Sequence, residues 1–387
     1  MLRRLLLLCL FLLMRDGYAA QIFVGPDSFS RIGSGLDSAS NQWRPSCFDG
    51  IIQPATPNRS ITMKIYASQS ASEILEDQRG YGSAQVDFWV LGAKARSEFI
   101  LRNSESETQS TLMWSLDYRG ASVYFNKREL NARGRAAAAL PMAEQRKMCG
   151  DQFIIGAALG ARFYLAASLL FDSQTKYRYF KTKVSASAFG GLLKKEKKSI
   201  DEVRQVAGDA HLSVQVFQYG GETFDLDLLS ASQVSYCSMD NLDPCLERFS
   251  ALHRYAFGPD GFRKHVDSRK PEQLAVLYLN ASSYQDAGHF LSADAVKPGT
   301  DPGFVSLSEQ LFEWNRTVQQ SISRVSALLL SNASRSVADK AMAQQELTAL
   351  QNKARAIQAA VVACSDSENY EACKTRLDSI HAMVASP

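Results

Sequence analysis

The stretch "KMCGDQFIIGAALGARFYLAASLL", residues Lys147–Leu170, decides the fold of this chain. Its length and apolar character suggest a membrane-spanning helix, but Arg162 lies near its middle. A charge at the centre of a bilayer costs about 2.5–3.5 kcal/mol. The stretch also contains several glycines, each of which weakens a helix by about 1 kcal/mol relative to alanine. We therefore predict a long strand over Gln152–Phe171, bent where isolated glycines allow it.

The N-terminus has the pattern of an export signal. Arg3 and Arg4 precede the apolar run Leu5–Met14, and the small residues Ala19 and Ala20 suit cleavage. An uncleaved anchor is the alternative, but this run is far shorter than the ~20 residues that span a bilayer. We predict that residues 1–20 are a signal peptide and that the protein is secreted. Cleavage lowers the formal net charge from +3 to +1, which gives no support for nucleic acid as a partner.

The cysteines are consistent with secretion. Once the signal peptide and its Cys9 are removed, six cysteines remain, and an even number in an exported chain indicates disulfides. Two pairs enclose short turn-like sequences, "CSMDNLDPC" and "CSDSENYEAC". Free thiols and a metal site are the alternatives, although the chain contains no CxxC motif. The expected pairs are Cys237–Cys245, Cys364–Cys373 and, by what remains, Cys47–Cys149.

The order of elements is duplicated around the opening stretch. A segment of mixed helix and strand character, Ser68–Thr108, lies between strands predicted at Ser60–Ala67 and Thr111–Phe125. A second such segment, Lys181–Ala210, lies between the Gln152–Phe171 strand and one at Leu212–Tyr219. Ordinary helices packed on a sheet are the simpler interpretation of both segments. Each nevertheless contains apolar residues at every second position, as in a strand: Ala84, Val86, Phe88 and Val90 in the first, and Val184, Ala186 and Ala188 in the second.

The rest of the chain divides by composition. Residues 31–50 are rich in Gly, Ser, Asn and Pro and are predicted as loops. Helices are expected over Asn131–Met148 and Leu242–Glu272, and a short strand follows the second. We assign residues 21–300 to one domain and 301–387 to a C-terminal helical hairpin or small bundle. The helical spacing there is carried by Leu311, Trp314, Val318, Ile322, Val325, Leu329, Leu347, Leu350, Ala354, Ile357, Val361, Leu377 and Ile380.

The glycine-containing stretch resembles a family signature. Cys149-Gly150-Asp151-Gln152-Phe153, six residues and then Gly160-Ala161 resemble the motif of the membrane attack complex/perforin and cholesterol-dependent cytolysin (MACPF/CDC) superfamily. Asp151, Gln152 and Ala161 depart from the family pattern, as in divergent bacterial members. "GSGLDSASNQWRPSC", the pair Gly220-Gly221 and "LAVLYLNASSY" extend the resemblance over residues 33–288.

The resemblance implies an α+β fold with a bent, twisted four-stranded antiparallel sheet whose third strand carries the motif. Two helical clusters flank that sheet, and each unrolls into a β-hairpin that crosses the bilayer. The two mixed segments identified above would be these clusters. Backbone groups in lipid must all be paired, so such hairpins persist only in a closed barrel formed by a ring of subunits. Val86, Phe88 and Val90 would then face lipid, and the lysines at 194, 195, 197 and 198 would lie at the hairpin tip or in the lumen.

The function implied by the resemblance is a secreted protein that assembles on a target membrane into a β-barrel pore. Its partners would be membrane lipids or a surface receptor, and further copies of itself. The alternative is a secreted or surface-bound adhesin that keeps the fold without lysis. An enzyme is not expected, because the sequence has neither GxSxG nor HExxH and its five histidines are scattered. We expect no cofactor and no metal.

Overall fold

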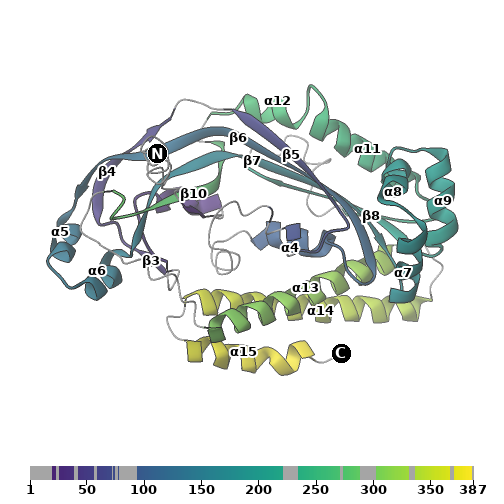
Figure 1. Ribbon diagram of the computed structural model, residues 1–387. Coiled ribbons are helices and arrows are strands. Elements are labelled where there is room, and N and C mark those ends of the chain that lie inside the picture. Colours follow the sequence, from purple (N-terminus) through teal and green to yellow (C-terminus); the bar gives the residue numbers. More distant parts are fainter. Residues whose placement is uncertain are drawn as a thin grey trace, which may run out of the picture.

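A computed structural model describes residues 20–22, 26–38, 42–55, 59–71, 73–74, 77, 94–220, 234–270, 273–287, 302–330, 336–366 and 370–385. A long, bent antiparallel sheet runs across the molecule, with helices at both ends and along both sides (Figure 1). The predicted α+β class with an antiparallel sheet is confirmed.

Four strands that follow one another in the chain form one half of the sheet. They are β5 (Ser60–Ala67), β6 (Gln109–Leu130), β7 (Gln152–Leu170) and β8 (His211–Tyr219). Each pairs antiparallel with the next. The strand that begins with the motif, β7, is therefore the third of four, as predicted.

The other half of the sheet extends beyond the predicted four strands. Here β6 pairs with β4 (Phe48–Pro54), and β7 pairs with β10 (Ala275–Ser283) and with β2 (Gly35–Asp37). Short edge strands complete the sheet: β1 (Ala20–Ile22) pairs with β10, β3 (Gln42–Arg44) with β2 and β9 (Ser235–Ser238) with β8. The prediction of loops over residues 31–50 is therefore wrong in part, since β2, β3 and the start of β4 lie there. A 3-10 helix, η1 (Pro26–Arg31), precedes them.

The two halves meet at a bend. The β6–β7 register shifts between Arg119 and Ala121, opposite Gly160. A bulge of this kind bends a strand and increases its twist. Gly160 permits the close approach, because a Cβ atom there would lie 1.9 Å from the carbonyl oxygen of Tyr118.

The charge in the middle of the opening stretch is neutralised across the sheet. Arg162 on β7 is only 4% exposed. Its Nε and Nη2 donate to the two carboxylate oxygens of Asp117 on β6 at 3.0 and 3.2 Å. A bidentate pair of this kind satisfies the buried guanidinium, so an arginine can lie within this apolar strand.

Helices cover both faces of the β5–β8 half. On one side lies α4 (Lys94–Asn103). On the other lie α7 (Gln174–Lys183), α8 (Ala186–Leu193), α9 (Lys197–Ala207), α11 (Asp243–Phe257) and α12 (Phe262–Asp267). The helix predicted over Leu242–Glu272 is thus two helices, α11 ending at Gly258. The segment Asn131–Met148 is likewise divided at Pro141 into α5 (Ala132–Ala138) and α6 (Met142–Cys149).

The C-terminal region is helical, as predicted. It consists of α13 (Pro302–Leu330), α14 (Val337–Asp366) and α15 (Tyr370–Ala385). These helices run beneath the sheet in Figure 1. Within the described ranges, no helix combines the length and apolar character needed to cross a bilayer. The three helices share an apolar core of Leu311, Val318, Ile322, Ile357, Ala360, Leu377 and Ile380.

Two of the three expected disulfides are present. Cys47–Cys149 and Cys237–Cys245 have S–S distances of 1.94 and 2.02 Å. The first joins the start of β4 to the end of α6 and so fixes the turn that leads into β7. The side chains of Cys364 and Cys373 are outside the described residues.

Candidate functional site

The candidate site consists of two helical clusters that lie against opposite faces of the β5–β8 half. We define the first cluster as residues 68–108, of which the structure describes 68–71, 73–74, 77 and 94–108, and the second as residues 171–210. Strand residues alternate between the two faces. Met113, Tyr164 and Phe217 meet the first cluster, whereas Leu112, Phe163 and Leu165 meet the second.

The sheet face beneath the first cluster carries many polar side chains. Thr111 and Ser168 are hydrogen-bonded at 2.8 Å. Asn103 at the end of α4 donates to Gln215 of β8 at 3.2 Å, and Ser213 is buried beside them. Among the described residues, the apolar core on this face is also smaller than the one on the opposite face. Since burial of apolar area is the main stabilising term, releasing α4 from the sheet costs less than releasing the second cluster.

The C-terminal helix α13 packs on the first cluster through polar contacts. Arg102 Nε of α4 donates to Gln319 Oε1 of α13 at 2.7 Å, and within α13 Gln319 Nε2 donates to Asn315 Oδ1 at 3.4 Å. Asn315, Gln319 and Ser323 are all buried. Polar interfaces of this kind are typical of contacts that separate without unfolding. The predicted domain boundary near residue 301 remains a proposal, and this interface is where the two parts would separate.

The second cluster is held by apolar burial. Phe189, Leu192 and Val203 are fully or almost fully buried in one core with the sheet residues. Serine caps begin α7 and α8, since Ser173 Oγ and Ser185 Oγ accept from backbone N–H groups three residues on, at 3.3 and 3.1 Å. The segment is therefore helical here because of caps and tertiary packing, although its residues also suit a strand.

Among the predicted membrane-inserting residues, Val184 and Ala188 are buried and Ala186 is exposed. Val184 lies at the end of α7 and the two alanines lie in α8. Ala84, Val86, Phe88 and Val90 are outside the described residues. Insertion of either set remains a prediction.

One carboxylate ties the two clusters together. Glu105, which follows α4, accepts hydrogen bonds from Tyr177 Oη and Lys181 Nζ of α7. Burial and the bond to Glu105 raise the pKa of Tyr177 to about 12. The same carboxylate raises the pKa of Lys181 by hydrogen bonding. Both partners of Glu105 thus remain protonated, and the contact is retained, throughout the physiological pH range.

The motif residues form two separate groups along β7. Near its start, Cys149 is held by its disulfide, and Asp151 accepts from the backbone N–H of Ser38 at 2.6 Å. Phe153 packs against Phe48, with ring centroids 4.8 Å apart. Gly150 has a φ of 81°, and a Cβ there would lie 2.3 Å from the carbonyl oxygen of Leu36.

The second group lies at the bend. A Cβ on Gly220, whose φ is 75°, would lie 2.6 Å from the carbonyl oxygen of Gly160 and 3.3 Å from the Cα of Ala161. Gly221 is outside the described residues. The first group thus anchors β7 to the disulfide, and the second forms the bend.

Replacing Gly160 by valine is expected to destabilise the fold by about 1–3 kcal/mol, as overpacked sites do. The new side chain meets the backbone of Tyr118, which cannot move without breaking the β6–β7 pairing. Denaturant unfolding of the variant measures the change. Gly190→Val is the matched control, since its φ is not positive and the only atom within 4 Å of a Cβ there is Leu112 Cδ1, at 4.0 Å. A smaller loss for Gly160→Val than for this control would contradict the role of Gly160 at the bend.

Acidification is expected to loosen the packing of α11 on the second cluster. Burial, with a smaller contribution from Lys194, lowers the pKa of His253. A group whose pKa is depressed by folding must be neutral in the folded state, so its contribution is present above the unfolded pKa of about 6.5 and is lost as the pH falls. The melting temperature should therefore fall between pH 7.5 and 5.5. The fall should be smaller in His253→Gln, and an equal fall would exclude His253 as its source.

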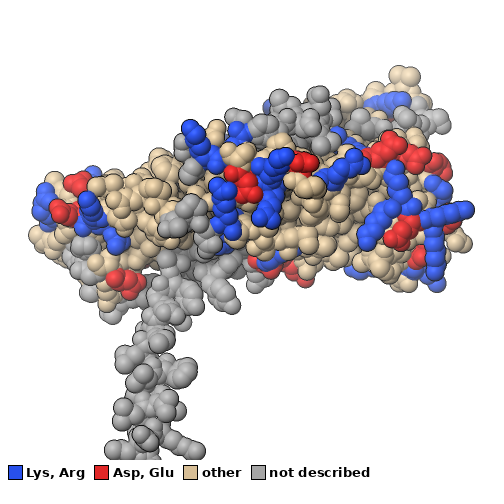
Figure 2. Space-filling model, turned by 90° about the horizontal axis from the view of Figure 1, so that it is seen from above, with Lys and Arg blue, Asp and Glu red and all other residues tan. Residues whose placement is uncertain are grey.

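Other chemistry has no support in this region. Within the described ranges, no group of three or more His, Cys, Asp or Glu side chains is placed to hold a metal ion. Figure 2 shows Lys and Arg mixed with Asp and Glu over the face that it presents. That face therefore presents no single-sign field that would attract a polyanion.

Sequence reasoning located both clusters but missed the contacts that hold them. The Arg162–Asp117 pair, the Glu105 contact and the Arg102–Gln319 contact each join residues at least 45 positions apart. Arg162 was the only one of these positions to carry a visible signal, as a charge within an apolar run.

Comparisons with known proteins give similarity in structure only. No protein-family model matches the chain, and no curated protein is significantly similar to it in sequence. The solved structure of stonustoxin aligns with 94% of this chain at 10% identity and a TM-score of 0.44. Listeriolysin O aligns with 69% at 13% identity and a TM-score of 0.35. A putative cell invasion protein with a MAC/Perforin domain from Bacteroides thetaiotaomicron aligns with 68% at 10% identity and a TM-score of 0.27. The chain spans 45%, 58% and 59% of these three chains, respectively.

Proposed function

We propose that the protein is a secreted pore-forming protein of the MACPF/CDC type. It oligomerises on a target membrane and inserts two β-hairpins per subunit into a β-barrel. The observation that carries the proposal is the position of the two clusters in the topology. The first connects β5 to β6 and the second connects β7 to β8, and both leave the sheet at the same end of these strands.

In the observed register, the end of β5, the start of β6, the end of β7 and the start of β8 lie side by side. Ala67 pairs with Leu112, Gln109 with Leu170, and Leu170 with His211. If both clusters unrolled, β5 to β8 would continue past these strand ends as one extended four-stranded sheet. A transmembrane strand takes about 9–11 residues, and each cluster is long enough for two such strands and a turn.

Closure of a barrel requires neighbouring subunits, and the sheet offers two edges for them. On one side β5 pairs only with β6, among the described strands, and exposes Ile61, Met63 and Ile65. On the other side β9 covers β8 only along His211–Val214. An apolar edge strand that lacks an outer neighbour is a ready site for pairing with another chain. Pairing of β5 with β8 of the next subunit would be head-to-tail, the arrangement that produces rings.

The contacts described above suggest an order of release. The first cluster lies on the more polar face, and α13 holds it by polar contacts that membrane binding could replace. The second cluster has the larger apolar core and would follow. Glu105, which bridges the clusters, would lose its partners at the first step.

Dye release from liposomes tests the proposal. The mature chain, residues 21–387, should release a trapped dye at nanomolar to micromolar concentration from vesicles of at least one of several lipid compositions. Binding to those vesicles without release would support the alternative of a non-lytic adhesin and would contradict the pore. Neither binding nor release from vesicles or from cells would exclude membrane action altogether.

Edge variants test the assembly step. Met63→Glu places a charge on the exposed apolar edge of β5, where pairing would bury it, and should reduce dye release at least tenfold while vesicle binding persists. Ile51→Glu on β4 is the matched control, since Ile51 is similarly exposed, at 47% against 54% for Met63. Chemical crosslinking of vesicle-bound protein should show oligomers for the control only. Equal loss in both variants would contradict pairing through β5.

A further inference from the structure

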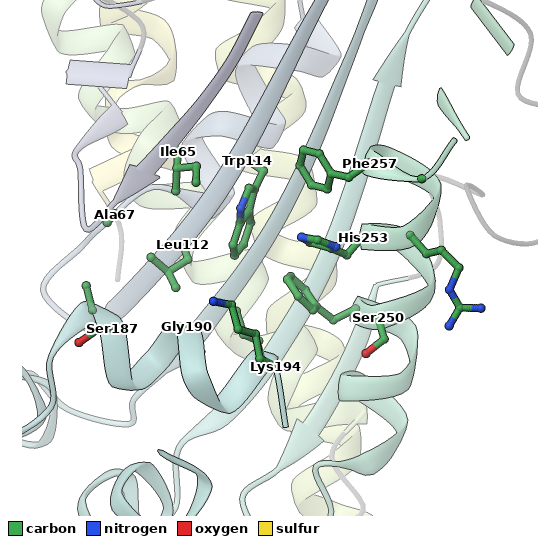
Figure 3. A pocket seen from close by; sticks show the side chains of 15 residues that line it. Ile65, Ala67, Leu112, Trp114, Ser187, Gly190, Lys194, Ser250, His253 and Phe257 are labelled. Atoms are coloured by element: carbon green, nitrogen blue, oxygen red, sulfur yellow. The ribbon is translucent and has the colours of Figure 1, made fainter. Parts of the chain in front are cut away.

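A cavity of about 860 Å³ lies between the second cluster, α11 and the edge formed by β5 and β6. Figure 3 shows side chains from all three elements converging on it. Its volume is within the range of about 300–1,000 Å³ that is typical of small-molecule sites. Nothing in the pore mechanism requires an opening at this position.

The walls of the cavity are mostly hydrocarbon and aromatic. Trp114 of β6 lies 5.2 Å from Phe249 of α11, between ring centroids, and His253 lies 4.5 Å from Phe257. Leu112 and other aliphatic side chains complete the wall. Such a surface offers few hydrogen-bonding partners to a sugar or a nucleotide, whose polar groups would be buried at a cost. A hydrocarbon chain suits it better.

The charged groups that line the cavity are cations. Lys194, at the end of α8, and Arg254 of α11 belong to the lining, and no carboxylate does. In the part of the chain that the structure describes, neither forms an ion pair. Figure 3 shows the ammonium group of Lys194 directed toward the interior of the cavity. A ligand with one anionic group would therefore be complementary to this end of the site.

Two adjacent glycines in α8 show that the cavity is open because a side chain is missing. Gly191 is required by packing, because a Cβ there would lie 2.2 Å from Ser199 Oγ. At Gly190 the only atom within 4 Å of a Cβ is Leu112 Cδ1, at 4.0 Å. Glycine weakens a helix by about 1 kcal/mol relative to alanine, and no contact requires it at this position. Its effect is to leave the cavity unfilled.

We propose that this cavity is a binding site for a long-chain carboxylate, with the acyl chain against Trp114 and Phe249 and the carboxylate at Lys194. The bound chain would touch α8, α11 and the sheet together. A ligand that binds only the compact state stabilises it. On the proposed pore function, the ligand would therefore oppose unrolling of the second cluster, and its loss would favour insertion.

Calorimetric titration of the mature chain with palmitate, below its critical micelle concentration, tests the site. We expect one equivalent bound, and a melting temperature raised by about 3 °C or more at 100 times Kd. Gly190→Leu should weaken binding at least tenfold without lowering the melting temperature of the free protein. Lys194→Gln should weaken binding of palmitate about tenfold but leave binding of hexadecanol unchanged. Lys198→Gln is the matched control and should bind palmitate as the unmodified protein does.

The proposal is overturned if palmitate does not bind at 100 μM, or if Gly190→Leu binds it as well as the unmodified chain. It is also overturned if Lys194→Gln and Lys198→Gln behave alike. These measurements need no membrane, so they are independent of whether the protein forms pores. If the protein binds palmitate at this site but never releases dye, the proposal of the binding site stands and the proposed pore function is wrong.

Discussion

Dye release is expected to fall at least 100-fold when the two clusters are linked through the Glu105 contact. The variant carries Glu105→Cys and Lys181→Cys, joined by a short bismaleimide whose vicinal-diol spacer is cleaved by periodate, which leaves the native disulfides intact. Both side chains reach the same point in the compact state, where Lys181 donates to Glu105. The two clusters lie against opposite faces of the sheet, so a link between them would prevent either from extending into a hairpin. Cleavage of the spacer should restore release.

A second linked pair controls for the chemistry. Gln53→Cys and Asn126→Cys replace an exposed pair on β4 and β6, whose side chains are hydrogen-bonded at 3.1 Å. This pair lies in the half of the sheet that keeps its structure on the proposed pathway. Crosslinking it should leave dye release within a factor of two. If the variant crosslinked between positions 105 and 181 released dye fully, pore formation would not require the clusters to separate, and the proposed mechanism would be wrong.

Loss of the Cys47–Cys149 disulfide is expected to cost about 4–5 kcal/mol in the free energy of unfolding. The two cysteines are 102 positions apart, and in the chain-entropy account a loop of about 100 residues is worth ~4.7 kcal/mol. Cys237 and Cys245 are only 8 positions apart, so their disulfide is worth about 2.5 kcal/mol on the same account. Denaturant unfolding of the two double-alanine variants measures both values.

The difference between the two variants is more informative than either value alone. Cys47, Cys149 and Cys245 are fully buried and Cys237 is 6% exposed, so the packing losses are similar and largely cancel. If the two variants lost equal stability, the long loop would not be restrained in the unfolded state, and the assigned pairing of Cys47 with Cys149 would be in doubt. Reduced-protein controls separate the disulfide contribution from the substitution.

The strands could be predicted from the sequence where the local pattern and the tertiary environment agree. Ser60–Ala67 is predicted and observed with identical bounds, because its β-branched residues suit a strand in any context. The Cys237–Cys245 disulfide is predicted from its short spacing, and Cys47–Cys149 as the pair that remains. The bend could be predicted because isolated glycines interrupt the apolar run. The reason that Gly160 must be glycine, its close approach to the backbone of Tyr118, is visible only in the structure.

The rest depends on partners that the sequence does not bring together. The short strands β2 and β3 lie in a stretch rich in Gly, Ser, Asn and Pro, which favour loops. They form because β7 offers an edge to β2, and β2 in turn pairs with β3. The contacts at Glu105 and Gln319 join polar residues that are unremarkable where they occur. The cavity is the least predictable feature, because it is defined by a side chain that Gly190 lacks.

The most direct test of the central claim is the conformation of residues 184–188 in the membrane-bound protein. Single cysteines placed at each position, labelled with an environment-sensitive fluorophore, report whether the side chain enters lipid. We predict that on liposomes the labels at 184, 186 and 188 shift to the emission of a lipid environment, while those at 185 and 187 remain aqueous. Such alternation is possible only for a strand with one face in the bilayer. A helical pattern, in which 184 and 188 respond together and 186 does not, or no response during dye release, would contradict the account.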